Sequence, residues 1–177
     1  MSTKATSTKA LLLIDFENEW TIPTSPYYVG DLKDLITKIN QLIDSCRNNN
    51  YKIIFITHIE KDSDIVFKEN SNNIEIIPSL HKLSQDILIK KYKISPFYQT
   101  TLEQELQGIT ELVIAGILTN LCVRSTIHDA YDREFKITVI TDCCTTFDPK
   151  THDFTIQDLK ATREEIIFLP LKEFLQQ

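Results

Sequence analysis

The feature that most constrains this chain is the regular alternation of short apolar segments with longer amphipathic ones. Runs rich in β-branched residues recur at residues 11–14, 53–57, 87–89, 112–115, 137–140 and 166–169. Runs of this length and composition are typical of strands that are buried on both faces of a sheet. The sequence therefore predicts about six buried strands.

Segments with a helical period lie between these runs. Apolar residues recur at three- and four-residue steps through residues 32–46, and a second such pattern covers residues 123–131. Parallel strands buried on both faces are joined by right-handed helical crossovers. We therefore expect an α/β fold, a three-layer α/β/α sandwich around a Rossmann-like, mostly parallel sheet.

The chain length favours a single domain. A chain of 177 residues is long enough to bury one substantial core, and no internal repeat or linker divides it. We interpret residues 1–177 as one domain in which residues 1–9 are flexible. Residues 60–83 form a long polar connection of the kind that serves as a lid or binding loop.

Composition and charge narrow the range of functions. The formal net charge is −6 and Lys and Arg form no stripe, so neither nucleic acid nor an anionic membrane is an expected partner. No apolar run approaches the roughly 20 residues that span a bilayer. The expected partner is a small-molecule substrate, and assembly into a homo-oligomer stays open.

Glycine and cysteine usage excludes further classes. The spacing of the three glycines cannot form either Gly-rich phosphate-binding loop. The four cysteines contain no C-x-x-C pair and the polar start has no signal-peptide character, which disfavours a zinc ribbon and a secreted disulfide scaffold. We expect reduced thiols in a cytoplasmic protein. Cys46, Cys143 and Cys144 are interpreted as packing residues.

The residues that follow the predicted strands are the candidates for chemistry. Ligands of open parallel sheets bind beyond the carboxyl ends of the strands. Reading these positions gives Asp15, His58, Lys91, residues 116–122 and Asp142. Asp15, Lys91 and Cys122 supply an acid, a base and a thiol, which together make a chemically coherent set.

Cys122 is the candidate nucleophile. It lies three residues after Thr119, a residue type that caps helix N-termini, so we expect it in the first turn of a helix. The helix dipole there favours an anion and lowers the pKa of a thiol. The alternative interpretation is that Cys122 is a small buried apolar residue, as free cysteines often are.

Asp15 and Lys91 are the candidate partners of this thiol. A carboxylate that ends the first strand could act as its general base, and a lysine at another strand end could hold that acid ionised. A loop-capping role for Asp15 and a solvated basic edge around Lys91 are the alternatives. A haloacid-dehalogenase role for Asp15 is disfavoured, because it needs a second Asp two residues on, where Glu17 stands. A receiver-type phosphoacceptor role is disfavoured, because the companion acidic pair is missing before this strand.

Three motifs resemble those of the isochorismatase-like cysteine hydrolases, which include nicotinamidases, N-carbamoylsarcosine amidases, ureidoacrylate amidases and isochorismatases. LLLIDFENEW resembles the family's opening strand and D-x-Q-N-D-F turn, with Asp15 at the catalytic Asp. IKKYKISPF is similar to K-x-x-x-S-x-F and places the catalytic lysine at Lys91. GILTNLCV is similar to G-x-x-T-x-x-C-V and places the nucleophile at Cys122.

The resemblance implies a catalytic triad of Asp15, Lys91 and Cys122. Asp15 would take the thiol proton, the Cys122 thiolate would attack a carbonyl carbon, and water would hydrolyse the resulting thioester. Lys91 would orient and stabilise the charged partners. The resemblance also implies a non-proline cis peptide between Ile117 and Leu118, with the N–H groups of Leu118 and Cys122 as the oxyanion hole.

Departures from the family pattern bear on metal and substrate. Nicotinamidases carry an Asp and His metal cluster after the second strand, but this segment reads THIEKDSD, with His58 as its one histidine. We therefore disfavour a nicotinamidase, expect no metal and no cofactor, and interpret His58 as a hydrogen-bonding residue at a strand end. Glu17 replaces the usual Gln, which alters the charge of the pocket. His152 falls where many relatives carry a His, and a surface role is the alternative for it.

The leading interpretation is a metal-independent amidohydrolase that cleaves a C–N bond of a small amide, carbamoyl or ureide compound. One alternative is vinyl-ether hydrolysis of the isochorismatase type, which uses acid chemistry at Asp15 and needs no thiol. Another is a catalytically silent relative that binds or assembles. The sequence does not identify the substrate.

Overall fold

The computed structural model describes residues 8–177. Most of the segment that was expected to be flexible, residues 1–7, lies outside the described residues. Lys9, however, is already the first residue of a strand and pairs with Glu111. The expectation of flexibility is therefore wrong for Lys9, because the ladder of the sheet extends to it.

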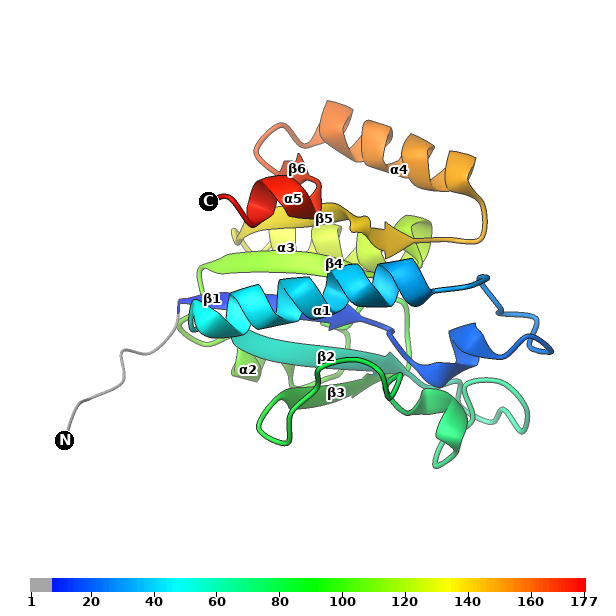
Figure 1. The fold of residues 1–177 in the computed structure, drawn as a ribbon. Coiled ribbons are helices and arrows are strands. Elements are labelled where there is room, and N and C mark those ends of the chain that lie inside the picture. Colours follow the sequence, from blue (N-terminus) through cyan, green and yellow to red (C-terminus); the bar gives the residue numbers. More distant parts are fainter. Residues whose placement is uncertain (1–7) are drawn as a thin grey trace.

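Six strands form one fully parallel sheet, as the sequence predicts (Figure 1). Their order across the sheet is β3-β2-β1-β4-β5-β6. The strands are β1 (Lys9–Ile14), β2 (Lys52–His58), β3 (Ile87–Lys91), β4 (Glu111–Ile117), β5 (Lys136–Thr145) and β6 (Ile167–Leu169).

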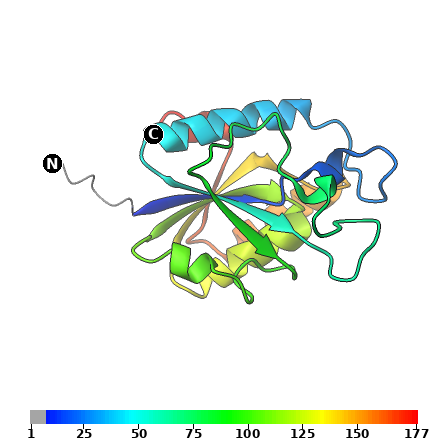
Figure 2. The same ribbon diagram turned by 90° about the horizontal axis from the view of Figure 1, so that it is seen from below.

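Helices cover both faces of this sheet, which gives the expected three layers (Figure 2). α1 (Lys33–Asn48) and α5 (Leu171–Phe174) lie on one face. α2 (Leu102–Glu105), α3 (Arg124–Tyr131) and α4 (Pro149–Thr162) lie on the other. Shorter turns are the 3-10 helices η1 (Asn18–Thr21) and η2 (Asn72–Ile74) and the π-helical turn η3 (Thr119–Val123).

Each face of the sheet has its own apolar layer. The predicted amphipathic helix α1 buries Ile39, Leu42, Ile43 and Cys46 against one layer. α3 buries Ile127 and Ala130 in the other layer. The apolar faces of the helices therefore pack against the sheet and hold its strands in place.

The chain changes direction across the sheet between β1 and β4, which are neighbours. Ile14 at the end of β1 pairs with Gly116 in β4. A Cβ atom on Gly116 would lie 2.5 Å from the Cβ of Ile14, so only glycine permits this close approach. The two strand ends that carry Asp15 and η3 are thereby adjacent, at the point where α/β sheets bind ligands.

Asp142 does not follow a strand, and its assignment as a strand-end candidate is corrected here. β5 continues to Thr145, with an irregularity in its register opposite Ile114 and Gly116. The Asp142 carboxylate accepts the N–H of Leu171 at 2.7 Å and pairs with Lys38 at 2.9 Å. Asp142 thus joins α5 and α1 to the sheet rather than contributing to a site.

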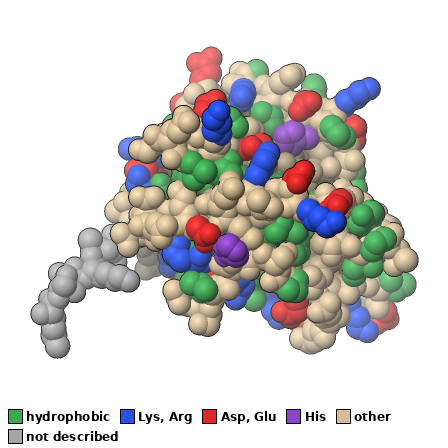
Figure 3. Space-filling model, viewed as in Figure 1, with side chains coloured by type: hydrophobic (Ala, Val, Ile, Leu, Met, Phe, Trp, Pro, Cys, Tyr) green, Lys and Arg blue, Asp and Glu red, His purple; other side chains and the backbone are tan. Residues whose placement is uncertain are grey.

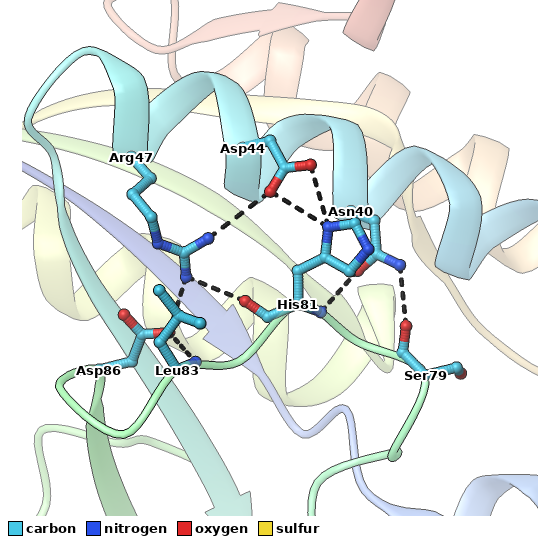
Figure 4. Close-up of polar contacts among 7 residues, drawn as sticks. All are labelled: Asn40, Asp44, Arg47, Ser79, His81, Leu83 and Asp86. Carbon is cyan, nitrogen blue, oxygen red and sulfur yellow. Dashed lines mark hydrogen bonds and ion pairs between the residues drawn. The ribbon is translucent and has the colours of Figure 1, made fainter.

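The long connection between β2 and β3 is held to α1 (Figure 4). Arg47 pairs with Asp86 at 2.8 Å, Asp44 contacts His81 at 2.9 Å, and Asn40 accepts the N–H of His81 at 2.8 Å. Near its start the same connection is held by Glu19, which accepts the N–H of Phe67 and the side-chain amide of Asn73. These contacts hold the connection in place beside the sheet.

The described surface carries mixed charge. Acidic and basic side chains are interspersed over the face seen in Figure 3. Among residues 8–177, no helix has both the length and the apolar character needed to cross a membrane.

Candidate active site

Asp15 lies immediately after β1 and is fully buried. Its backbone has a φ of 56°, a left-handed conformation that Asp tolerates better than most residues. Its N–H donates to the carbonyl of Ile56 at 2.9 Å. The turn therefore bends the chain at a fixed point and holds the carboxylate at the carboxyl edge of the sheet.

Lys91 ends β3, and its ammonium reaches across the end of β2. Nζ lies 2.8 Å from Asp15 Oδ2 and 3.3 Å from Cys122 Sγ. It is also 3.3 Å from Nδ1 of His58. Burial opposes the charge, but Asp15 and Cys122 raise the pKa of Lys91, so it is an ammonium. The structure thus brings all three residues of the predicted triad together.

Cys122 lies in the π-helical turn η3, which leads into α3. The expected N-cap role of Thr119 is wrong, because Leu118 is the N-cap and Thr119 is the first residue of the turn. The buried Thr119 hydroxyl is instead 2.8 Å from Nδ1 of His152 on α4. The sequence correctly placed Thr119 near the start of the helix, but its side chain contacts His152 on α4 instead of capping the helix.

The peptide bond between Ile117 and Leu118 is cis, as the resemblance implies. Among residues 8–177, the Leu118 N–H has no backbone acceptor. The carbonyl of Leu118 accepts the N–H groups of Leu121 and Val123 at 3.1 and 3.2 Å. The segment before Cys122 is therefore held by its own turn.

The pKa of the Cys122 thiol is raised, not lowered. Burial is the main cause, and the negative charge of Asp15 adds to it. Lys91 acts in the opposite direction but does not outweigh them. The expectation from the helix dipole is thus corrected, because burial and a neighbouring carboxylate dominate. The resting thiol carries its proton, next to a carboxylate that can remove it.

Glu17 and His58 belong to the same cluster; the sequence predicted a hydrogen-bonding His58 at a strand end and a changed pocket charge at Glu17, but not the contact between the two residues. Glu17 is fully buried, and its carboxylate oxygens lie 3.0 and 3.2 Å from the backbone N of His58. Burial and the charge of Asp15 hold the pKa of Glu17 well above its usual range. The signal in the sequence was the acidic residue two positions after Asp15, in place of the family's Gln.

The surroundings of His58 do not fit a metal site. One ring nitrogen faces the Lys91 ammonium and the other lies 3.4 Å from Glu60. Within residues 8–177, no group of three or more His, Cys, Asp or Glu side chains is arranged to hold a metal ion. A cation beside the ring is the opposite of what a metal ligand requires.

An aromatic group lines the cluster on the side of the long connection. The ring of Phe67 lies 5.3 Å from the ring of His58 and 5.0 Å from that of Trp20, measured between centroids. Trp20 also contacts Tyr27 and Phe147. The Nε1–H of Trp20 is buried and has no hydrogen-bond partner among the described residues.

The other three cysteines are free and buried. Cys46 and Cys143 belong to the apolar layer beneath α1, and Cys144 belongs to the opposite layer. Burial raises the pKa of Cys46 and of Cys144 to about 12. Their interpretation as packing residues is confirmed.

Comparison with known proteins identifies the class. Residues 9–167 match the model of the isochorismatase domain. The chain is 30% identical over 175 residues to the isochorismatase family protein YaaI of Bacillus subtilis, covering 90% of this chain and 96% of the relative. It is 25% identical over 166 residues to nicotinamidase 3 of Arabidopsis thaliana, covering 85% and 79%. A probable inactive nicotinamidase of the same plant is 28% identical over 171 residues, covering 85% and 87%.

Solved structures share the fold. An isochorismatase-like hydrolase from Alkaliphilus metalliredigens superposes with a TM-score of 0.86 at 21% identity, covering 96% of this chain and 98% of that one. An N-carbamoylsarcosine amidase from Thermoplasma acidophilum gives a TM-score of 0.79 at 20% identity, covering 93% and 97%. The chain belongs to the isochorismatase family of hydrolases.

Proposed function

We propose that this protein is a metal-independent amidohydrolase that cleaves a C–N bond of a small amide, carbamoyl or ureide substrate through a Cys122 thioester. One observation carries the proposal: side chains from three separated strand ends meet, with the buried Lys91 ammonium 2.8 Å from Asp15 and 3.3 Å from the Cys122 sulfur. The similarity to nicotinamidase 3, an amide hydrolase by its name, supports the reaction class.

The first half-reaction forms the thioester. Asp15 removes the proton of the Cys122 thiol, and the thiolate attacks the carbonyl carbon to form an S–C bond. Asp15 then returns this proton to the nitrogen as the C–N bond breaks and the amine leaves. Lys91 stays charged and stabilises the thiolate and the carboxylate in turn.

The second half-reaction releases the acid. Asp15 takes a proton from water, the oxygen attacks the thioester carbon, and the S–C bond breaks. The thiolate regains its proton from Asp15. We assign stabilisation of the oxyanion in both halves to the N–H groups of Leu118, which directly precedes η3, and of Cys122, which lies within it.

A panel of amides, carbamoyl amines and ureides, scored by release of ammonia or amine, tests this function. Hydrolysis of at least one class, unchanged after dialysis against a chelator, is the expected result. Activity that is lost to the chelator and restored by zinc or iron would contradict metal independence.

Two alternatives give different results when isochorismate and the Cys122→Ala variant are added to this experiment. A vinyl-ether hydrolase would act on isochorismate and keep its activity in Cys122→Ala, because its chemistry needs acid at Asp15 rather than a thiol. A silent relative would hydrolyse nothing in the panel; the similarity to a probable inactive nicotinamidase makes this the alternative to test first.

A further inference from the structure

We propose that His58 is a positioning residue of this active site, which holds Lys91 in register with Asp15 and Cys122 by accepting one of its N–H groups. The inference rests on the proposed function for its kinetic consequences. The contacts that carry it are independent of any substrate.

The Lys91 ammonium has as many side-chain partners as it has N–H groups. A lysine ammonium has three N–H groups and no acceptor. Lys91 Nζ has three close polar side-chain neighbours: Asp15 Oδ2 at 2.8 Å, Cys122 Sγ at 3.3 Å and His58 Nδ1 at 3.3 Å. Because the Lys91 side chain is fully buried, a lost partner is not replaced by bulk water. His58 therefore completes the set that fixes the ammonium.

The role requires a neutral imidazole with its proton on Nε2. Only then can Nδ1 accept from the ammonium, while the Nε2–H points to Glu60 at 3.4 Å. Burial and the Lys91 charge lower the pKa of His58, which favours this neutral form. Asp15 and Glu60 act in the opposite direction but do not outweigh them.

Glu17 fixes the backbone of the same residue. Its two carboxylate oxygens lie 3.0 and 3.2 Å from the N of His58, at the last position of β2. The strand register pairs His58 with Lys91. Glu17 therefore holds the strand end from one side while β3 holds it from the other, which leaves the imidazole directly beside the ammonium.

The groups that face His58 determine how it responds to pH. They are Asp15 and Glu17 after β1, Lys91 on β3, and Glu60 on its own loop. Protonation of His58 removes the acceptor and places a second cation against Lys91. The loss of activity is therefore expected as the pH falls through the lowered pKa of His58.

Two substitutions separate positioning from packing. His58→Leu removes the acceptor, and His58→Asn keeps an acceptor oxygen near the place of Nδ1 but cannot become charged. We expect His58→Leu to lower kcat on the order of tenfold with little change in KM, since one buried donor loses its partner. We expect His58→Asn to restore most of kcat and to shift the acid limb of the kcat profile to lower pH. His81→Asn, on the exposed contact with Asp44, is the matched control and leaves the profile unchanged.

Alkylation of Cys122 by iodoacetamide distinguishes failure of the inference from failure of the proposed function. His58→Leu is expected to slow alkylation several-fold, because Lys91 no longer stabilises the thiolate, and His58→Asn to restore it. If the panel shows no hydrolysis but alkylation follows this order, the proposed function fails and the inference stands. If His58→Asn keeps the wild-type acid limb, or if both variants are alkylated at the wild-type rate, the inference is overturned. Should His58→Leu fail to fold, the result for His58→Asn decides alone.

Discussion

Two clusters in this protein use the same residue types in different surroundings. The buried cluster comprises Asp15, Glu17, His58 and Lys91, and the surface cluster comprises Asp44, Arg47, His81 and Asp86. Each cluster contains two carboxyl groups, one histidine and one basic residue, which is Lys91 in the buried cluster and Arg47 in the surface cluster. The side chains of Asp15 and Lys91 are 0% exposed, whereas those of Asp44 and His81 are 50% and 53% exposed.

Burial makes the charges of the first cluster depend on one another. Burial and Asp15 raise the pKa of Glu17, and burial and Lys91 lower that of His58. In the surface cluster water screens the exposed pair of Asp44 and His81, so that contact is worth little, whereas the side chain of Asp86 is only 4% exposed where it meets Arg47. Burial therefore gives the first cluster shifted pKa values, which acid–base catalysis can use, while the surface cluster holds the long connection against α1.

The largest effect is expected at the sulfur beside the buried cluster. Cys122→Ala should abolish hydrolysis, about a thousandfold or more in kcat, because removing the nucleophile removes the effect of the whole catalytic unit. Cys46→Ala, in the apolar layer beneath α1, is the control and should leave kcat unchanged. Near-normal turnover by Cys122→Ala would rule out the thiol mechanism.

Asp15→Asn should lower kcat by about a hundredfold or more, because proton transfer contributes that much in comparable enzymes. The variant keeps the shape of the side chain but cannot accept the thiol proton. Steady-state kinetics with the best substrate of the panel measures this loss. A kcat within a few-fold of the wild type would exclude Asp15 as the base.

A change in the surface cluster should affect stability but not turnover. Asp86 accepts the N–H of Leu83 at 2.7 Å and pairs with Arg47 at 2.8 Å. Asp86→Ala leaves these donors without their partner and should lower the free energy of unfolding by about 1–3 kcal/mol. Urea denaturation measures it, and kcat should stay at the wild-type value. A large fall in kcat would mean that the connection positions catalytic groups.

The smallest effect is expected from Glu17→Gln, which keeps an acceptor for the His58 N–H. The folded state raises the pKa of Glu17, so the stability from its neutral form is present below the unfolded pKa and is lost as the pH rises through the folded pKa. Relative to wild type, Glu17→Gln should gain in melting temperature toward pH 8 and show no gain near pH 4. Glu164→Gln on the exposed surface is the control. A difference that is constant with pH would contradict this account.

Local patterns predicted the fold well, because each element is encoded in its own segment. The β-branched runs located all six strands, and the helical period located α1. β5 was expected to end near Ile140, but it continues to Thr145 through an irregular register with β4. That irregularity depends on pairing between strands, and the short apolar run carried no sign of it. The misplacement of Asp142 follows from the same cause.

The positions of the candidate site residues could be predicted from the sequence, but the contacts among them could not. Asp15 and Lys91, and Cys122 beside the cluster, were located by the rule that ligands of parallel sheets bind beyond the strand ends and by the family resemblance; Cys122 itself lies in η3, after β4. The proximity of Glu17 to His58 joins residues 41 positions apart and depends on how β1 and β2 end together. The raised pKa of Cys122 was missed for a related reason, since the degree of burial is a property of the assembled sheet.

Interception of the thioester by hydroxylamine tests the central claim most directly. Hydroxylamine attacks a thioester to give a hydroxamate, or a hydroxyurea from a carbamoyl group, in competition with water. During turnover of the best substrate, the account predicts that this product grows in proportion to added hydroxylamine and is absent with Cys122→Ala. Continued release of ammonia with the hydrolysis product alone, at every hydroxylamine concentration, would contradict a Cys122 thioester.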